Sequence, residues 1–230
     1  MSLKFQKRRQ LAAFNQYEEE YEKLKSNIEF SCFENKCKTI VFTSANEKEG
    51  TTTTVTHLAT SLAESGYNVL IIDTNIKKPM IHKMFKIKNS FGLSNVLTGQ
   101  KEFNEVINQT EISRLKVLST GPVPYSSEKL FRSVTFDSLL KKLSYEFDFI
   151  LIDTSPVLVG NEAKIISSKC DGVVLVVRCG KTEDFIVLEA KKSLEVAKAN
   201  LLGVILNKKP LGWMKKIRTF FTPSRSLLRN

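Results

Sequence analysis

Short apolar runs alternate along this chain with longer segments in which apolar residues recur at helical spacing. The runs are nearly continuous and rich in Val and Ile, which is typical of strands buried on both faces of a parallel sheet. We expect strands at 38–43, 68–73, 115–118, 149–153, 173–178 and 202–206. Helical patterns lie between them at 52–65, 102–108, 135–146 and 183–199, and a helix with charged faces is expected at 14–30.

This alternation predicts an α/β fold with a doubly wound, mostly parallel sheet. A length of 230 residues, 42% of them hydrophobic, suits one such domain. The predicted organisation is a basic, helical extension at 1–35, the α/β domain at 36–207 and a basic aromatic tail at 208–230. No apolar run approaches the roughly 20 residues that span a bilayer. The N-terminus lacks a signal peptide's apolar core, so we expect a cytoplasmic protein.

The net charge of +11 is carried by the two ends of the chain. Residues 1–13 contribute +4 and residues 208–230 contribute +7, so the remainder is balanced. Basic ends can contact anionic lipid, nucleic acid or an acidic partner. In the tail, Trp213, Phe220 and Phe221 stand beside basic residues, which favours an anionic membrane surface; an ordinary basic tail is the alternative. Aromatic and basic residues do not interleave within the fold, so we expect no nucleic-acid partner.

The segment from Thr43 to Thr54, TSANEKEGTTTT, connects a predicted strand to a predicted helix. That is the context in which G-x-x-x-x-G-K-[ST] binds phosphate. Gly50 occupies the second glycine position, and backbone N–H groups at 50–53 would point at an anion. The lysine position, however, holds Thr51, and Lys48 stands where a glycine is expected. The alternative is an ordinary threonine-capped turn between strand and helix.

Two aspartates, Asp73 and Asp153, each end a predicted strand. The carboxyl ends of parallel strands form the crevice where such sheets bind ligands. One carboxylate could hold Mg²⁺ and the other could orient a nucleophile or attract its proton, although a lone strand-end Asp is often only a cap or turn former. We also expect Glu47 and Glu49 to line the rim, where each would repel a phosphate charge by roughly 3 kcal/mol.

Several longer segments, in order, resemble one known family. They are YEKLKSNIEF (21–30), VLIIDTNIKKPMIHKMFKI with GLSNVLTG after it (69–99), STGPVPYSSEKLF (119–131), FDFILIDTSPVL (147–158), CDGVVLVVRCGKT (170–182) and GVILNK (203–208). This series is similar to the cytoplasmic kinase domain of the bacterial tyrosine kinases of the CpsD/CapB group, which regulate capsule and exopolysaccharide synthesis. That family is related to the MinD and ParA ATPases, so the resemblance implies a P-loop NTPase-like fold.

The resemblance also implies ATP and Mg²⁺ as cofactors. The implied site residues are Gly50, Thr51, Thr52 and Thr53 in the phosphate loop, Asp73 and Asp153 in catalysis, Thr52, Asp73 and Asp153 around the metal, and Asn207 against the base. The implied partners are a membrane protein that activates the kinase and controls polysaccharide chain length, and further copies of the chain. The implied location is the cytoplasm, at the inner face of the cell membrane.

Three departures from the family pattern bear on activity. Thr51 replaces the lysine, Lys48 replaces a glycine, and Asn75 replaces the second Asp of D-x-D-x-[RK]. Loss of the phosphate-bridging cation or of a metal carboxylate should each cost several kcal/mol of transition-state stabilisation, on the order of 10²-fold or more. We therefore expect a tyrosine kinase with impaired catalysis; the alternative is a non-catalytic scaffold that docks to the membrane polysaccharide machinery. Whether Lys48 or Lys77 replaces the missing ammonium is left open.

Two further departures concern assembly. The family's E-x-x-R-x-x-R oligomerisation pattern corresponds here to Glu19, Glu22 and Lys25, so that one basic position holds an acid. This change argues against a ring contact of the family's type. The family's C-terminal tyrosine cluster is also missing, because the last of the five tyrosines is Tyr145.

Overall fold

The computed structural model describes residues 19–33, 37–122 and 126–208. These residues form a seven-stranded sheet in the order β3-β4-β2-β5-β1-β6-β7. Every neighbouring pair is parallel except β3 with β4. The strands are β1 (Thr39–Ser44), β2 (Val69–Asp73), β3 (Asn108–Gln109), β4 (Leu115–Leu118), β5 (Phe149–Asp153), β6 (Gly172–Arg178) and β7 (Leu201–Asn207).

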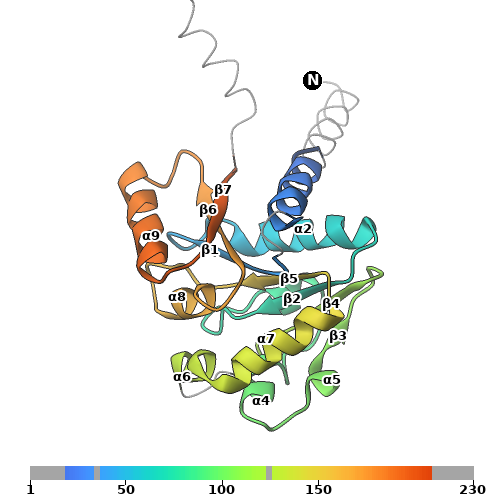
Figure 1. The fold of residues 1–230 in the computed structure, drawn as a ribbon. Coiled ribbons are helices and arrows are strands. Elements are labelled where there is room, and N and C mark those ends of the chain that lie inside the picture. The colour runs from blue at the N-terminus through green and yellow to red at the C-terminus, as the bar shows by residue number, and fades with distance from the viewer. Residues whose placement is uncertain (1–18, 34–36, 123–125, 209–230) are drawn as a thin grey trace, which may run out of the picture.

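Helices cover both faces of the sheet (Figure 1). One face packs against α2 (Thr51–Glu64) and the helix formed by residues 19–33. The other face packs against a larger set of helices, α7, α8 and α9 among them. The remaining bounds are α3 (Ile81–Met84), α4 (Leu93–Leu97), α5 (Phe103–Val106), α6 (Ser127–Arg132), α7 (Val134–Glu146), α8 (Glu162–Ser167) and α9 (Asp184–Val196).

The helix α2 shows how the sequence pattern produces this packing. Its Val55, Leu58 and Leu62 recur at helical spacing and are fully buried against the sheet. Burying each of these side chains stabilises the fold by roughly 2 kcal/mol. Ile28 and Cys32 of the helix over 19–33 join the same core, so this helix is part of the packed fold. The carboxyl ends of the strands are thereby fixed beside the first turn of α2.

All six predicted strands are confirmed, and so are the predicted helices at 52–65, 135–146 and 183–199. The helix expected at 102–108 is shorter, because α5 ends at Val106 and residues 108–109 belong to β3. The helix expected at 14–30 is present from residue 19 and extends to 33; residues 14–18 lie outside the described part. The helices α3, α4, α6 and α8 were not predicted, since four to six residues carry too little periodicity.

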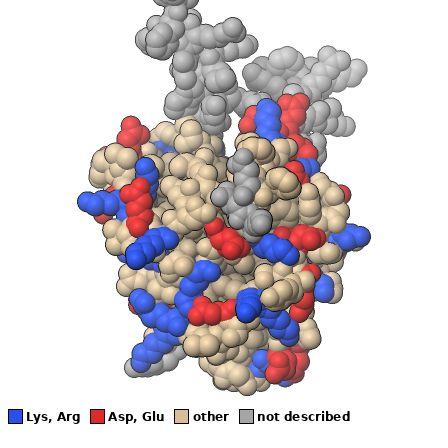
Figure 2. All heavy atoms as spheres, in the orientation of Figure 1, with Lys and Arg blue, Asp and Glu red and all other residues tan. Residues whose placement is uncertain are grey.

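The predicted domain boundaries at 35/36 and 207/208 stay predictions. The basic segment 1–13 and the aromatic residues Trp213, Phe220 and Phe221 lie outside the described residues. On the face that Figure 2 shows, acidic and basic side chains are interspersed and form no single field, as expected from the balanced charge of the fold. Within the described ranges, no helix combines the length and the apolarity required to cross a bilayer.

Candidate nucleotide site

The loop between β1 and α2 turns sharply at Gly50. Gly50 has a φ of 97°, in the left-handed region that favours glycine. A Cβ atom here would lie 2.1 Å from Nδ2 of Asn207, so the position also requires glycine for space. The Gly50 carbonyl accepts the Thr54 amide at 3.0 Å and so starts the helix. The N–H groups of the first turn remain without partners inside the helix, as an anion site requires.

The threonines of the first turn of α2 have different surroundings. Thr51 is buried, with 8% of its surface exposed. Thr52 is half-buried, and its Oγ1 donates a hydrogen bond to Oδ2 of Asp153 at 2.7 Å. Thr53 is exposed. The structure thus brings Thr52 to a predicted metal-binding carboxylate, whereas Thr53 faces solvent.

Asp73 and Asp153 are paired in register at the carboxyl ends of β2 and β5. Both are buried. Asp73 Oδ1 accepts the amide of Asn75 at 3.0 Å, and its Oδ2 accepts the amides of Met80 and Ile81, both at 3.1 Å. Burial raises the pKa of Asp73 to about 6 despite these hydrogen bonds. Burial, and secondly the charge of Asp73, raise the pKa of Asp153 well above its usual range, while the Thr52 hydrogen bond opposes the shift.

These side chains fit a hard divalent cation. Asp153 Oδ1 is buried and has no hydrogen-bond partner among the described residues. Two carboxylates and the Thr52 hydroxyl are the kind of oxygen donors that Mg²⁺ prefers, with water or phosphate oxygens completing its coordination. A cation there would relieve the repulsion between the two carboxylates and lower both pKa values. The described residues contain no cluster of three or more His, Cys, Asp or Glu that could hold a metal.

Glu49 corrects the prediction that two glutamates line the phosphate rim. Its side chain is buried, with 3% exposed, and turns into the fold. Glu49 Oε1 accepts Thr182 Oγ1 at 2.8 Å and the Asn46 amide at 3.2 Å. Glu47 is exposed but pairs with Lys78 Nζ at 2.6 Å. The repulsion expected at the rim is therefore smaller than the sequence alone indicates. Thr182 directly precedes the helix predicted at 183–199, and no motif links it to the loop.

The lysines near the loop are engaged elsewhere or point outward. Lys48 is exposed and has a left-handed backbone, with a φ of 64°. Lys77 Nζ lies 3.6 Å from Oε1 of Glu162, a largely buried carboxylate. Among the described residues, no lysine forms an ion pair or hydrogen bond with Asp73 or Asp153. Lys48 and Lys77 therefore make no contact of this kind with the two aspartates.

Asn207, the predicted base contact, lies against the phosphate loop. Its Nδ2 donates to the Glu49 carbonyl at 2.8 Å, and its Oδ1 accepts the Lys208 amide at 2.7 Å. The end of β7 is therefore fastened to the loop between β1 and α2. The contact with a base stays a prediction.

Comparison with known proteins shows which family these features belong to. The model of the AAA domain family matches residues 37–185. The tyrosine-protein kinase CpsD of Streptococcus agalactiae is 38% identical over 192 residues, 83% of this chain and 83% of its own. The tyrosine-protein kinase YwqD of Bacillus subtilis (strain 168) is 36% identical over 197 residues, 84% of this chain and 81% of its own. This chain belongs to the bacterial tyrosine-kinase family.

Solved structures agree with this membership. The chimerical protein CapA2B2 superposes with a TM-score of 0.80 at 34% identity, covering 84% of each chain. The kinase domain of the Escherichia coli tyrosine kinase ETK gives a TM-score of 0.79 at 28% identity, over 81% of this chain and 73% of its own. MinD from Pyrococcus horikoshii OT3, complexed with Mg-ADP, gives 0.63 at 22% identity over 74% of this chain and 69% of its own, a likeness of fold alone. The predicted P-loop NTPase-like, MinD-related fold is confirmed.

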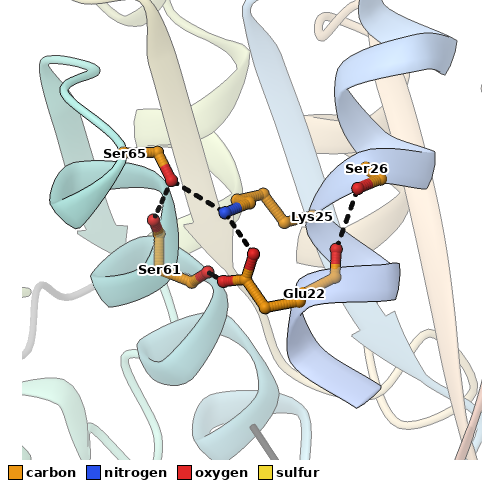
Figure 3. Close-up of polar contacts among 5 residues, drawn as sticks. All are labelled: Glu22, Lys25, Ser26, Ser61 and Ser65. Atoms are coloured by element: carbon orange, nitrogen blue, oxygen red, sulfur yellow. Dashed lines mark hydrogen bonds and ion pairs between the residues drawn. The ribbon is translucent and has the colours of Figure 1, made fainter. Parts of the chain in front are cut away.

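The N-terminal helix of this chain carries Glu19, Glu22 and Lys25, which the resemblance matches to an oligomerisation pattern. Figure 3 shows two of them turned toward α2 of the same chain. Glu22 Oε1 accepts Ser61 Oγ at 2.8 Å, and Lys25 Nζ donates to Ser65 Oγ at 2.8 Å. Glu22 and Lys25 also pair with each other at 2.6 Å. These two side chains are therefore occupied within the chain, and homo-oligomer formation stays a prediction.

Proposed function

We propose that this tyrosine-kinase homologue regulates capsule or exopolysaccharide synthesis while transferring phosphate from ATP to tyrosine weakly or not at all. Its proposed role is that of a docking subunit for a membrane activator protein of the polysaccharide machinery, at the cytoplasmic face of the membrane. Family membership supports the biological setting. The altered phosphate loop supports the loss of turnover.

The observation that carries this proposal is the buried threonine in the lysine position. A Thr51 hydroxyl is neutral, so it cannot offset the charge of the β- and γ-phosphates as an ammonium does. The nearby Lys77 and Lys78 are paired with Glu162 and Glu47. Removal of one preorganised positive contact from a transition state costs several kcal/mol, or on the order of 10²-fold in rate.

The metal half of the site is only partly retained. Mg²⁺, when bound, would neutralise phosphate charge beside Thr52, Asp73 and Asp153. Asn75 stands where the family has a second carboxylate, and its Oδ1 accepts the Lys78 amide at 3.3 Å within the loop. A neutral amide there holds a divalent cation less firmly than a carboxylate would. The retained residues therefore support weak cation binding without a complete catalytic arrangement.

Calorimetry with magnesium and ATP tests the proposal, together with phosphate transfer from labelled ATP to a tyrosine-containing copolymer. We expect weak binding and no transfer by the native chain. The combined change Thr51→Lys, Lys48→Gly and Asn75→Asp should tighten ATP binding by on the order of 100-fold, because it restores the charges that the site lacks.

A matched control moves the new lysine along the same helix. Thr60 lies further along α2 and is half-buried. Thr60→Lys, combined with Lys48→Gly and Asn75→Asp, should leave ATP binding weak. The native chain would also be assayed after co-expression with its membrane partner. The proposal is overturned if the native chain then transfers phosphate to tyrosine at least as fast as the restored variant does.

A further inference from the structure

The end of β7 reaches the phosphate loop through a single amide group. Asn207 donates to the Glu49 carbonyl through Nδ2 and accepts the Lys208 amide through Oδ1. The Asn207 carbonyl accepts the Cys179 amide at 2.9 Å, which fixes the strand end from the other side. The Asn207 side chain thus connects the Lys208 amide to the Glu49 carbonyl through two short hydrogen bonds.

Lys208 is a lysine without an ionic partner at this position. It has a left-handed backbone, with a φ of 55°, and it is exposed. It forms no ion pair with any residue in the described ranges, unlike Lys77 and Lys78. Standard bond lengths let an extended lysine side chain carry its Nζ about 6 Å from Cα. Asn207 contacts the Glu49 carbonyl in the loop, so the lysine that directly follows Asn207 is rooted beside that loop.

A second feature, an unpaired carboxylate oxygen, lies beside the first turn of α2. Asp153 is 1% exposed, and its Oδ1 has no partner in the described part of the chain. Its Oδ2 accepts the hydroxyl of Thr52, which belongs to that first turn. Unpaired helix N–H groups favour an anion, and an unpaired buried carboxylate oxygen favours a cation. A magnesium-bound di- or triphosphate presents both charges together.

We propose that Lys208 supplies, from the end of β7, the positive charge that Thr51 does not supply from α2. The loop with Lys208 then forms a binding site for a magnesium-bound di- or triphosphate. This inference rests on the proposed function, because it explains how a loop without its lysine retains anion affinity without turnover. A cation that approaches from the Asn207 side meets the phosphates at a different angle from one rooted in α2.

The test compares two lysines at opposite ends of β7. Lys208 follows the strand, and Lys198 precedes it; both are exposed and both have left-handed backbones, with φ of 55° and 57°. Calorimetry with magnesium-ATP and with magnesium-pyrophosphate would be performed on the full chain. We expect Lys208→Ala to weaken binding by on the order of tenfold. Lys208→Arg should keep binding near the native level, and Lys198→Ala should change it less than about twofold.

The same Lys208→Ala substitution, made in a Thr51→Lys protein, tests this inference separately from the proposed function. In a Thr51→Lys protein the charge is already supplied from α2, so Lys208→Ala should weaken binding by less than about twofold. Equal effects of Lys208→Ala and Lys198→Ala, or no binding of either probe by the native chain at millimolar concentration, would overturn the inference. Neither result depends on phosphate transfer. The transfer assay tests only the proposed function.

Discussion

The two halves of the candidate site differ in what holds them together. The carboxylate half keeps Asp73 and Asp153, with one oxygen unpaired among the described residues, although Asn75 replaces a further carboxylate of the family pattern. The loop half has lost its lysine, yet Gly50, Glu49 and Asn207 remain locked to one another. The loop therefore keeps its shape through packing and hydrogen bonds that do not depend on the phosphate-binding charge. The hydrogen bonds and packing that hold the loop are therefore separable from the charge that its lysine position lacks.

The largest expected effect is on the carboxylate side, in how the free energy of unfolding depends on pH. A carboxyl whose pKa is raised on folding destabilises the folded state when ionised. This penalty is absent below the unfolded pKa near 4, grows as pH rises, and is complete above the folded pKa. For Asp73, with a pKa raised to about 6, it is on the order of 3 kcal/mol. Asp153 shifts in the same direction.

We expect Asp153→Asn to stabilise the metal-free protein at neutral pH, because an amide carries none of the ionisation penalty that burial imposes on this carboxyl. The gain should fade toward about pH 4, where the native carboxyl is protonated. Urea unfolding in the presence of a chelator, with and without excess magnesium, measures it; magnesium should stabilise the native protein and reduce the gain. A gain that is the same at every pH would show that the charge of Asp153 is not the cause.

On the loop side, Gly50→Ala should cost roughly 2–3 kcal/mol of unfolding free energy. A methyl group there meets Asn207 and forces an alanine into a left-handed backbone. Gly66 is the matched control, since its φ of 99° is nearly the same but nothing lies within 4 Å of its added Cβ. Gly66→Ala should cost about 1 kcal/mol. Equal losses by urea unfolding would mean that the contact with Asn207 does not hold the loop.

The smallest effect is expected where the two halves meet. Thr52→Val removes the hydroxyl that donates to Asp153 and leaves both oxygens of that carboxylate without a partner among the described residues, at a cost of about 1–2 kcal/mol. Thr53→Val, one residue along on the exposed side, should change stability by less than about 0.5 kcal/mol. Chemical unfolding of the two variants at neutral pH gives the difference. Indistinguishable values would place the Thr52–Asp153 hydrogen bond among those that add nothing to stability.

Sequence reasoning predicted the features that depend on neighbours along the chain. The buried strands follow from apolar runs, and the meeting of Asp73 with Asp153 follows from the rule that parallel strands end at one edge. The burial of Glu49 could not be predicted, because glutamate is usually exposed and its partner Thr182 is 133 residues away. The contact between Asn207 and Glu49 is equally remote, since the two residues are 158 positions apart. Such contacts leave no periodic or motif signal in a single sequence.

One consequence of the contacts in Figure 3 concerns mechanical coupling through the helix α2. It has fourteen residues and is therefore a stiff rod of about 20 Å. Thr51 stands at one end, while Ser61 and Ser65 near the other end grip the N-terminal helix through Glu22 and Lys25. Because α2 is continuous between these two ends, a tilt that a ligand imposes on its first turn would also move the N-terminal helix formed by residues 19–33.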